Sequence, residues 1–318
     1  MSNAVSTPED DVQHAARLLS AGETQQAEEL ATELLRTMPA HARLHMIRAV
    51  AREASGRIGA AYDGYWQTLA ADPCFGGART AVLEAALRPH TAGMNKNFAL
   101  GSGERQVAGE IANIRADHRA RYAGAALWLN QHVPDIRRAC GLDVFCGNGY
   151  GSRMLADLTG ARMLGVDGSF EAVGQAQRQF GSHRVVYGQA FFPFSLTEGL
   201  FGFATCLESA EHVADPHGLL QQLSQATEGP LVVSVPLEEQ MPFEVNKVHF
   251  KHHTRHFTVG EIRDLLAAVG RPVIAACWGQ RAYNLKNREI DGLLPPERMA
   301  LTPLNPDSQF LLAIACKA

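Results

Sequence analysis

Several features are absent from this sequence of 318 residues. No apolar run reaches the roughly 18 residues that span a bilayer, and the first residues, MSNAVSTPEDD, are polar and acidic, unlike a signal peptide. The six cysteines show no CxxC spacing. That pattern argues against a zinc ribbon or a disulfide scaffold and fits free thiols in a reducing compartment. We therefore expect a cytoplasmic protein.

An excess of basic residues is also absent. The chain has 29 Lys and Arg against 33 Asp and Glu, a net charge of −4, so general nucleic-acid binding is not expected. Apolar residues make up 46% of the chain, which excludes disorder as the overall state. The length suits two domains, or one large α/β domain with an appendage.

The N-terminal segment, residues 11–88, contains helix-forming residues and no β-rich run. When this segment is aligned with itself at an offset of 34 residues, identical small, apolar and turn-forming residues match: Gly22 with Gly56, Ala27 with Ala61, Leu35 with Leu69, and Pro39 with Pro73. This period resembles two tetratricopeptide repeats, with 80–87 as a capping helix. The alternative is a plain helical hairpin domain. Either kind of helical domain offers a surface for a protein partner or for self-association. We expect it to pack against the next domain, because two repeats alone bury little core.

We assign residues 1–90 to this helical domain, 91–105 to a linker rich in Gly and Asn, and 106–318 to a second domain. The second domain opens with a helical stretch over 106–133. Short apolar runs then alternate with amphipathic segments, which predicts crossovers and a mainly parallel sheet. We expect the last two runs to form an antiparallel pair at one edge. The seven runs are 141–146, 162–168, 183–188, 201–208, 230–236, 272–278 and 310–316.

A glycine-rich turn follows the first run, in GLDVFCGNGYGSRMLA. Gly147, Gly149 and Gly151 let a ligand touch the main chain before a helix N-terminus. Asp167 ends the second run, where an acid can accept both ribose hydroxyls of an adenosine. Asp143, inside the first strand, repels a pyrophosphate and suits a cation. This pattern favours S-adenosylmethionine over NAD, although Asp143 can also be read as a capping carboxylate.

With these motifs in order, residues 103–270 resemble class I S-adenosylmethionine-dependent methyltransferases. The resemblance implies a Rossmann-like, seven-stranded α/β sheet with one antiparallel strand, and methyl transfer from a sulfonium to a nucleophile. The resemblance also implies which residues of this chain contact the cofactor. These are the loop residues Asp143, Gly147 and Gly149, the ribose acid Asp167, Gln189 at the adenine amine, and Arg121 and Tyr122, with His118, in a helical motif near the cofactor. Arg121 would suit the methionine carboxylate, or lie on the helix surface.

Phe145 departs from the family pattern, which has Gly or Ala there. Its ring points into the sheet core or crowds the methionine end of the pocket; we expect the core. Together with Gln189, it keeps a second hypothesis open. In that hypothesis the α/β domain is a catalytically degenerate cofactor-binding or scaffold protein that acts through its helical repeats.

Glu208, Glu211 and His212 follow the fourth strand in ESAEH, at the edge where the transferred methyl should lie. In one interpretation His212 is the general base for a hydroxyl acceptor. In another, Glu208, Glu211, His212 and a later histidine, with His249 as candidate, bind Mg²⁺, Mn²⁺ or Zn²⁺. The E-x-x-E-H pattern is similar to that of small-RNA 2′-O-methyltransferases and ubiquinone-biosynthesis O-methyltransferases. In a third interpretation, the acids and histidines are structural and only form hydrogen bonds with the loop.

The resulting prediction is an O-methyltransferase whose acceptor is a hydroxyl on a sugar, glycan or secondary metabolite. N-methylation of an amino sugar stays open. Acceptors in this class are held by loops between the later strands, here 237–258 and 279–307, and such loops carry no general code.

Overall fold

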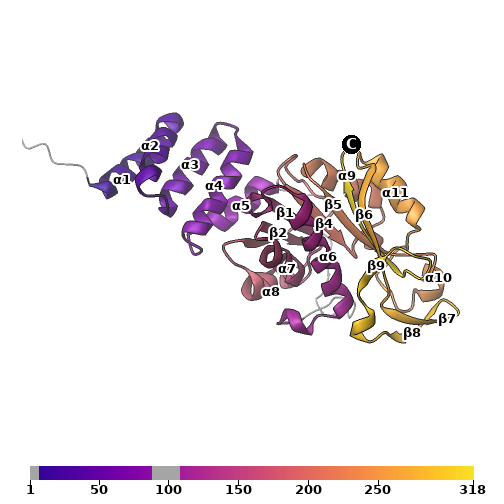
Figure 1. Cartoon of the computed structure of the whole chain (residues 1–318). Helices are drawn as coiled ribbons and strands as arrows, with labels where there is room; N and C mark the ends of the chain where they lie inside the picture. The colour runs from indigo at the N-terminus through magenta and orange to yellow at the C-terminus, as the bar shows by residue number, and fades with distance from the viewer. Residues whose placement is uncertain (1–6, 88–107) are drawn as a thin grey trace, which may run out of the picture. The chain divides into compact units, whose positions relative to one another are not determined.

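The computed structural model describes residues 7–87 and 108–318, and Figure 1 draws them as a helical part and an α/β part. These described residues form two compact units. The linker predicted at 91–105 lies outside them, as does the start of the helical stretch predicted from 106.

The N-terminal unit contains five helices in residues 8–86, together with the short segment Ser182–Val186 from later in the chain. The bounds of its third and fourth helices follow those of the first two at an offset of 34 residues, the offset that the sequence predicts. Gly22 and Gly56 adopt φ of +82° and +76° in the turn within each pair, a conformation that glycine adopts without strain. The tetratricopeptide assignment stays a prediction. The helices are α1 (Pro8–Ser20), α2 (Thr24–Thr37), α3 (Ala42–Ala54), α4 (Ile58–Ala71) and α5 (Ala78–Ala86).

Small residues let these helices pack closely. Ala27 and Ala61, which the repeat alignment pairs, are both fully buried. A Cβ atom added to Gly64 in α4 would lie 2.7 Å from that of Ala49 in α3, so the two helices meet at a distance that only glycine allows here. The burial of these small side chains follows from the apolar spacing along each helix.

The α/β unit has an eight-stranded sheet in the order β3-β2-β1-β4-β5-β10-β6-β9. The strands β2, β1, β4 and β5 pair in parallel, and β10 is antiparallel to both neighbours. The seven predicted runs all form strands: β1 (Cys140–Val144), β2 (Arg162–Asp167), β3 (Val185–Gln189), β4 (Phe203–Leu207), β5 (Leu231–Pro236), β6 (Val273–Gln280) and β10 (Phe310–Cys316).

The prediction of seven strands is wrong by one. The eighth strand, β9 (Leu301–Pro303), pairs with β6 and takes the edge. The last two predicted runs do pair antiparallel, as expected, but β10 lies between β5 and β6 rather than at an edge. A separate hairpin, β7 (Tyr283–Lys286) and β8 (Glu289–Leu293), fills part of the connection between them. Three residues with a proline give too weak a pattern to predict β9.

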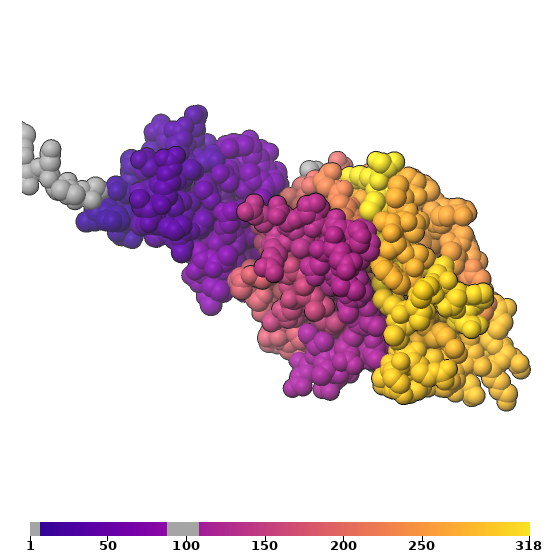
Figure 2. Space-filling view, in the orientation of Figure 1, coloured from indigo at the N-terminus to yellow at the C-terminus, as the bar shows by residue number. Residues whose placement is uncertain are grey.

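Helices connect most of the strands. The predicted stretch 106–133 forms a short 3₁₀ turn, η1 (Ile111–Asn113), and a helix that begins only at Ala116, α6 (Ala116–His132). That helix contacts β9, and their magenta and yellow surfaces adjoin in Figure 2. The other helical elements are η2 (Ile136–Arg138), α7 (Tyr150–Thr159), α8 (Phe170–Phe180), η3 (Ala210–His212), α9 (Pro216–Ala226), α10 (Phe243–Asn246), α11 (Val259–Ala268) and η4 (Pro296–Arg298).

Within residues 7–87 and 108–318, none of the helices combines the length and hydropathy needed to cross a membrane. All six cysteines are free thiols.

Candidate functional site

The glycine-rich turn joins β1 to α7 through backbone conformations that favour glycine. Gly147 has φ of +56° and Gly149 has φ of +87°. A Cβ atom on Gly149 would lie 2.6 Å from the ring of Tyr187, whose hydroxyl donates to the Gly149 carbonyl. Around Gly147 the same construction meets no atom within 4 Å among the described residues. The turn is therefore closely packed at Gly149 and has free space at Gly147, where a ligand can approach the main chain.

Asp167 ends β2 beside this turn. It is buried, and its carboxylate accepts hydrogen bonds from the backbone N–H groups of Gly147 (3.0 Å) and Ser169 (2.8 Å). Gln189 ends β3 and is exposed; its amide donates to the carbonyl of Gly168 (2.9 Å). The structure thus brings together the glycine loop, Asp167 and Gln189, which the sequence assigned to one cofactor.

Asp143 points away from solvent. One carboxylate oxygen accepts from the hydroxyls of Thr205 (2.7 Å) and Tyr122 (3.5 Å), and the other from that of Ser152 (2.7 Å). Burial raises its pKa to about 6, against the lowering effect of these three donors. Asp143 therefore ties α6, α7 and β4 together under the glycine loop, which matches the capping alternative.

Tyr122 supports the same loop from α6. Its ring is buried and packs edge-on against Tyr150, with ring centres 5.6 Å apart. A Cβ atom on Gly151 would lie 2.0 Å from the Tyr122 ring, so this glycine is needed for the contact between α6 and α7. The sequence assigned Tyr122 to the cofactor; in the structure its described contacts are with the loop's own scaffold.

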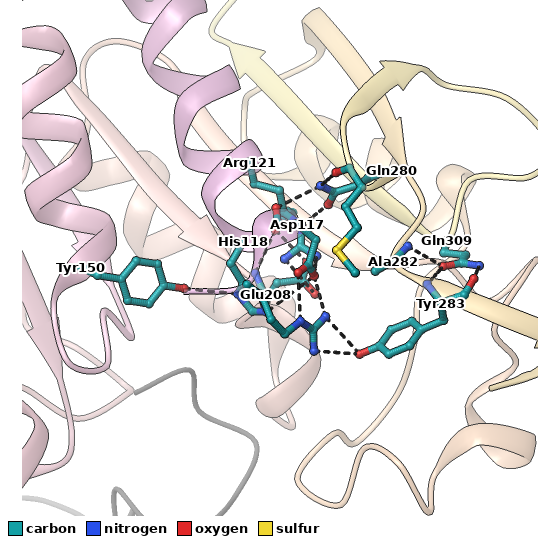
Figure 3. Close-up of polar contacts among 12 residues, drawn as sticks. Asp117, His118, Arg121, Tyr150, Glu208, Gln280, Ala282, Tyr283 and Gln309 are labelled. Atoms are coloured by element: carbon teal, nitrogen blue, oxygen red, sulfur yellow. Dashed lines mark hydrogen bonds and ion pairs between the residues drawn. The ribbon is translucent and has the colours of Figure 1, made fainter. Parts of the chain in front are cut away.

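Arg121 is buried rather than on the helix surface. Its guanidinium donates to Gln280 (2.6 Å) and Asp117 (3.0 Å), lies 3.6 Å from the Glu208 carboxylate, and stacks over the Phe310 ring. Figure 3 shows Arg121 close to Asp117, Glu208 and Gln280. The arginine expected to bind the methionine carboxylate is thus engaged by two acidic side chains of the protein.

Asp117 is the centre of this network. Its carboxylate also accepts from Arg115 (2.6 Å), which contacts the hydroxyl of Tyr283 (3.3 Å). Burial disfavours the charged carboxylate, but Arg121, His118 and Arg115 together lower the pKa of Asp117 below its ordinary value. On the other side, His118 contacts the Tyr150 hydroxyl (3.2 Å), and burial lowers the pKa of His118 to about 3. Neutral His118 therefore links the ion network to the helix after the glycine loop (Figure 3).

Phe145 is the non-glycine residue at the start of the glycine turn, and its φ is +55°. The ring is half-buried and lies 5.5 Å from that of Phe194. It is therefore not in the sheet core, where the sequence placed it. A left-handed backbone suits glycine, one of the two residue types of the family pattern, and strains a phenylalanine.

We expect Phe145→Ala to be less stable than Phe145→Gly by about 0.5–1 kcal/mol. Both changes remove the ring, but alanine keeps the left-handed strain that glycine relieves, which outweighs the greater freedom of glycine in the unfolded chain. Urea unfolding of the two variants measures the difference. An alanine variant as stable as the glycine variant would show that the backbone is not strained at this position.

Glu208 follows β4 with φ of +51°. Its carboxylate accepts from the hydroxyl of Ser234 (2.8 Å) and faces Arg121. Burial raises its pKa, and the charge of Arg121 opposes that shift. Glu208 therefore belongs to the ion network, and it is not among the described residues grouped as a set of metal ligands.

Glu211 and His212, in η3, meet His253 from the segment after α10. One ligand atom from each of these three residues lies within 4.8 Å of the others. His249, the histidine predicted as a metal ligand, is exposed and outside this group. The correction follows from the fold: the ring of His253 stacks on Phe250 (4.6 Å) and packs edge-on against His212 (4.6 Å).

Sequence reasoning missed the partners of the buried ion network, Asp117, Gln280 and Tyr283. The spacing of Asp117 and Arg121, four residues apart on a helix, was a signal for their pair. Gln280 and Tyr283 are more than 150 residues further along the chain, and no local pattern connects them to α6.

Comparison with known proteins agrees with this geometry. A family model described as a methyltransferase domain matches residues 116–275, half of the chain. Ubiquinone biosynthesis O-methyltransferases are similar: that of Leptothrix cholodnii is 33% identical over 103 residues, and that of Burkholderia ambifaria 34% over 97. These matches cover 31% and 29% of this chain and only 43% and 41% of the relatives' own lengths.

Solved structures of methyltransferases are similar to this chain at lower identity. One, from a complex with the Haloferax volcanii Trm112 methyltransferase activator, is 20% identical with a TM-score of 0.48, covering 63% of this chain and 91% of that one. Magnesium protoporphyrin IX methyltransferase from Synechocystis PCC 6803 is 19% identical with a TM-score of 0.47, covering 68% and 90%.

The chain belongs to the methyltransferase domain family, and its fold is the Rossmann-like one of class I methyltransferases.

Proposed function

We propose that the protein transfers a methyl group from S-adenosylmethionine to a hydroxyl oxygen of a small-molecule or glycan acceptor. The observation that carries this proposal is the group formed by Glu211, His212 and His253. A hydroxyl must lose its proton as its oxygen is methylated, and this group supplies basic nitrogen and oxygen atoms for that step. The similarity to ubiquinone biosynthesis O-methyltransferases supports methylation of oxygen.

On the donor side, the residues fit the cofactor. The Asp167 carboxylate accepts the ribose hydroxyls, and the exposed Gln189 offers its amide oxygen to the adenine amine. The open space at Gly147 admits the ligand to the main chain. Asn148 adds a buried side-chain oxygen without a hydrogen-bond partner among the described residues, which can accept a hydrogen bond from the bound ligand.

On the acceptor side, η3 follows β4 directly, and the parallel strands β1, β2 and β4 end at the same edge of the sheet. In open α/β sheets, ligands bind outside these carboxyl ends. The cofactor supplies a methyl group on a positively charged sulfur. The acceptor's O–CH₃ bond forms as the S–CH₃ bond breaks, and the hydroxyl proton leaves to a base. His212 Nε2 takes that proton directly; alternatively, Glu211, His212 and His253 would hold a cation that lowers the pKa of the hydroxyl, and the proton would leave to water. The two routes differ in their response to a chelator.

Acceptors that differ in one atom test the proposal. We expect S-adenosylhomocysteine to form with a sugar hydroxyl or phenol, and we expect His212→Ala to slow this reaction more than that of the amine that replaces the hydroxyl, because an amine needs no proton removed for its nitrogen to attack. Mass spectrometry of the products locates the methyl group. Methylation confined to nitrogen would overturn the proposal, and failure of the protein to bind S-adenosylmethionine would favour the scaffold hypothesis.

A further inference from the structure

The group of Glu211, His212 and His253, here called the Glu–His–His cluster, contains a carboxylate that its surroundings leave unsatisfied. Glu211 is fully buried, and neither of its oxygens has a hydrogen-bond partner among the described residues. Because an ionised carboxylate buried without partners is costly, Glu211 is either protonated or paired with a cation.

The hydrogen bonds of the histidines fix which ring nitrogen can bind a ligand. His256 Nδ1 lies 2.5 Å from the carbonyl oxygen of Met241, which only accepts, so this nitrogen carries the hydrogen. His256 Nε2 is then an acceptor in the neutral ring, and it lies 3.2 Å from His253 Nδ1. His253 Nδ1 is therefore the donor, and the lone pair of His253 is on Nε2.

His212 is arranged in the same way. Its Nδ1 lies 3.1 Å from the carbonyl oxygen of His252 and donates to it, which places the lone pair on Nε2. Two neutral imidazoles thus have their Nδ1 hydrogens engaged by neighbouring groups, which is the arrangement that orients metal-binding histidines in proteins. General-base catalysis requires only His212. It does not explain why the Glu211 carboxyl group is buried beside it, or why hydrogen bonds orient His253 through His256.

We propose that the Glu–His–His cluster binds one divalent cation, Zn²⁺ or Mn²⁺, through the Glu211 carboxylate and Nε2 of His212 and His253. Two imidazoles and one carboxylate suit these ions better than Mg²⁺ or Ca²⁺, which prefer oxygen ligands. Three protein ligands leave a coordination position open. The use of that position for the acceptor oxygen rests on the proposed function, where the cation would lower the hydroxyl's pKa; the binding of the cation does not.

Direct titration tests the site. The full chain, treated with EDTA and then freed of it, is saturated with S-adenosylhomocysteine and titrated with MnCl₂ or ZnSO₄ in a calorimeter. We expect one equivalent to bind, and at least a 100-fold weaker affinity in Glu211→Gln and in His253→Ala, since each loses a ligand. His256→Ala keeps all three ligands but loses the bond that orients His253, so a loss of about 10–100-fold is expected.

Two exposed histidines serve as controls. His217→Ala, in α9, and His249→Ala, the ligand predicted from the sequence, should bind the cation like the unmodified chain. Binding of S-adenosylhomocysteine by each variant shows that it is folded. No binding by the unmodified chain, or an unchanged affinity in Glu211→Gln, would overturn the site. Turnover that persists in EDTA would overturn the use of the cation for the acceptor oxygen while leaving O-methylation intact, whereas a bound cation without any turnover of hydroxyl acceptors would count against the proposed function alone.

Discussion

Replacing Asp167 by alanine is expected to weaken binding of S-adenosylmethionine by at least about 100-fold. Two hydrogen bonds between a carboxylate and ribose hydroxyls contribute roughly 1.5–3 kcal/mol each, and each 1.4 kcal/mol is a factor of ten. The same change removes the acceptor of the Gly147 N–H group, so the glycine loop also loses its link to the end of β2. Titration calorimetry of the two proteins measures the affinity ratio.

Asp157→Ala is the matched control for that experiment. Asp157 lies on α7, is 53% exposed and pairs only with Arg153 four residues earlier among its described contacts. Its removal should change neither cofactor affinity nor stability by a measurable amount. If Asp167→Ala bound the cofactor as tightly as Asp157→Ala does, Asp167 would have no place in the cofactor site, and its carboxylate would serve only to hold Gly147 and Ser169.

The donor side of the site could be predicted because sequence and topology fix it together. A glycine loop, an acid at the end of the next strand and a polar residue at the end of the third meet wherever three adjacent parallel strands end at one edge. Gly147, Asp167 and Gln189 therefore come together as a consequence of the order β3-β2-β1. Phe145 could be noticed as an exception, but its left-handed backbone is visible only in the structure.

The acceptor side could not be predicted to the same degree. Four histidines within eight residues are equivalent in the sequence, and the packing of Phe250 against His253 decides which of them reaches Glu211. Arg121 likewise has the right residue type for a ligand carboxylate. Its partners are Glu208, just after β4, and Gln280, at the end of β6, and only the folded sheet brings these two strand ends to α6.

The second large effect is expected at the centre of that ion network. Asp117→Asn should lower the free energy of unfolding by about 3–5 kcal/mol, because it preserves the shape of the side chain but leaves two guanidinium groups facing an uncharged amide. Arg121 is 2% exposed and would then retain only Glu208, 3.6 Å away, as a charged partner within 4 Å. Urea unfolding near pH 7, followed by circular dichroism, measures the loss.

The pH dependence of the same pair of proteins separates charge from shape. The folded pKa of Asp117 lies below its ordinary value of 3.8, so its charge stabilises the fold fully above about pH 4 and this contribution is lost as the pH falls toward the folded pKa. The gap between the unmodified chain and Asp117→Asn should therefore be constant from pH 5 to 7 and shrink in acid. Asp157→Asn, the same chemical change in an exposed pair, should cost no more than about 0.5 kcal/mol. A similar small cost for Asp117→Asn, or a gap that does not shrink in acid, would mean that packing around α6, and not the buried charges, holds Arg121 away from the cofactor.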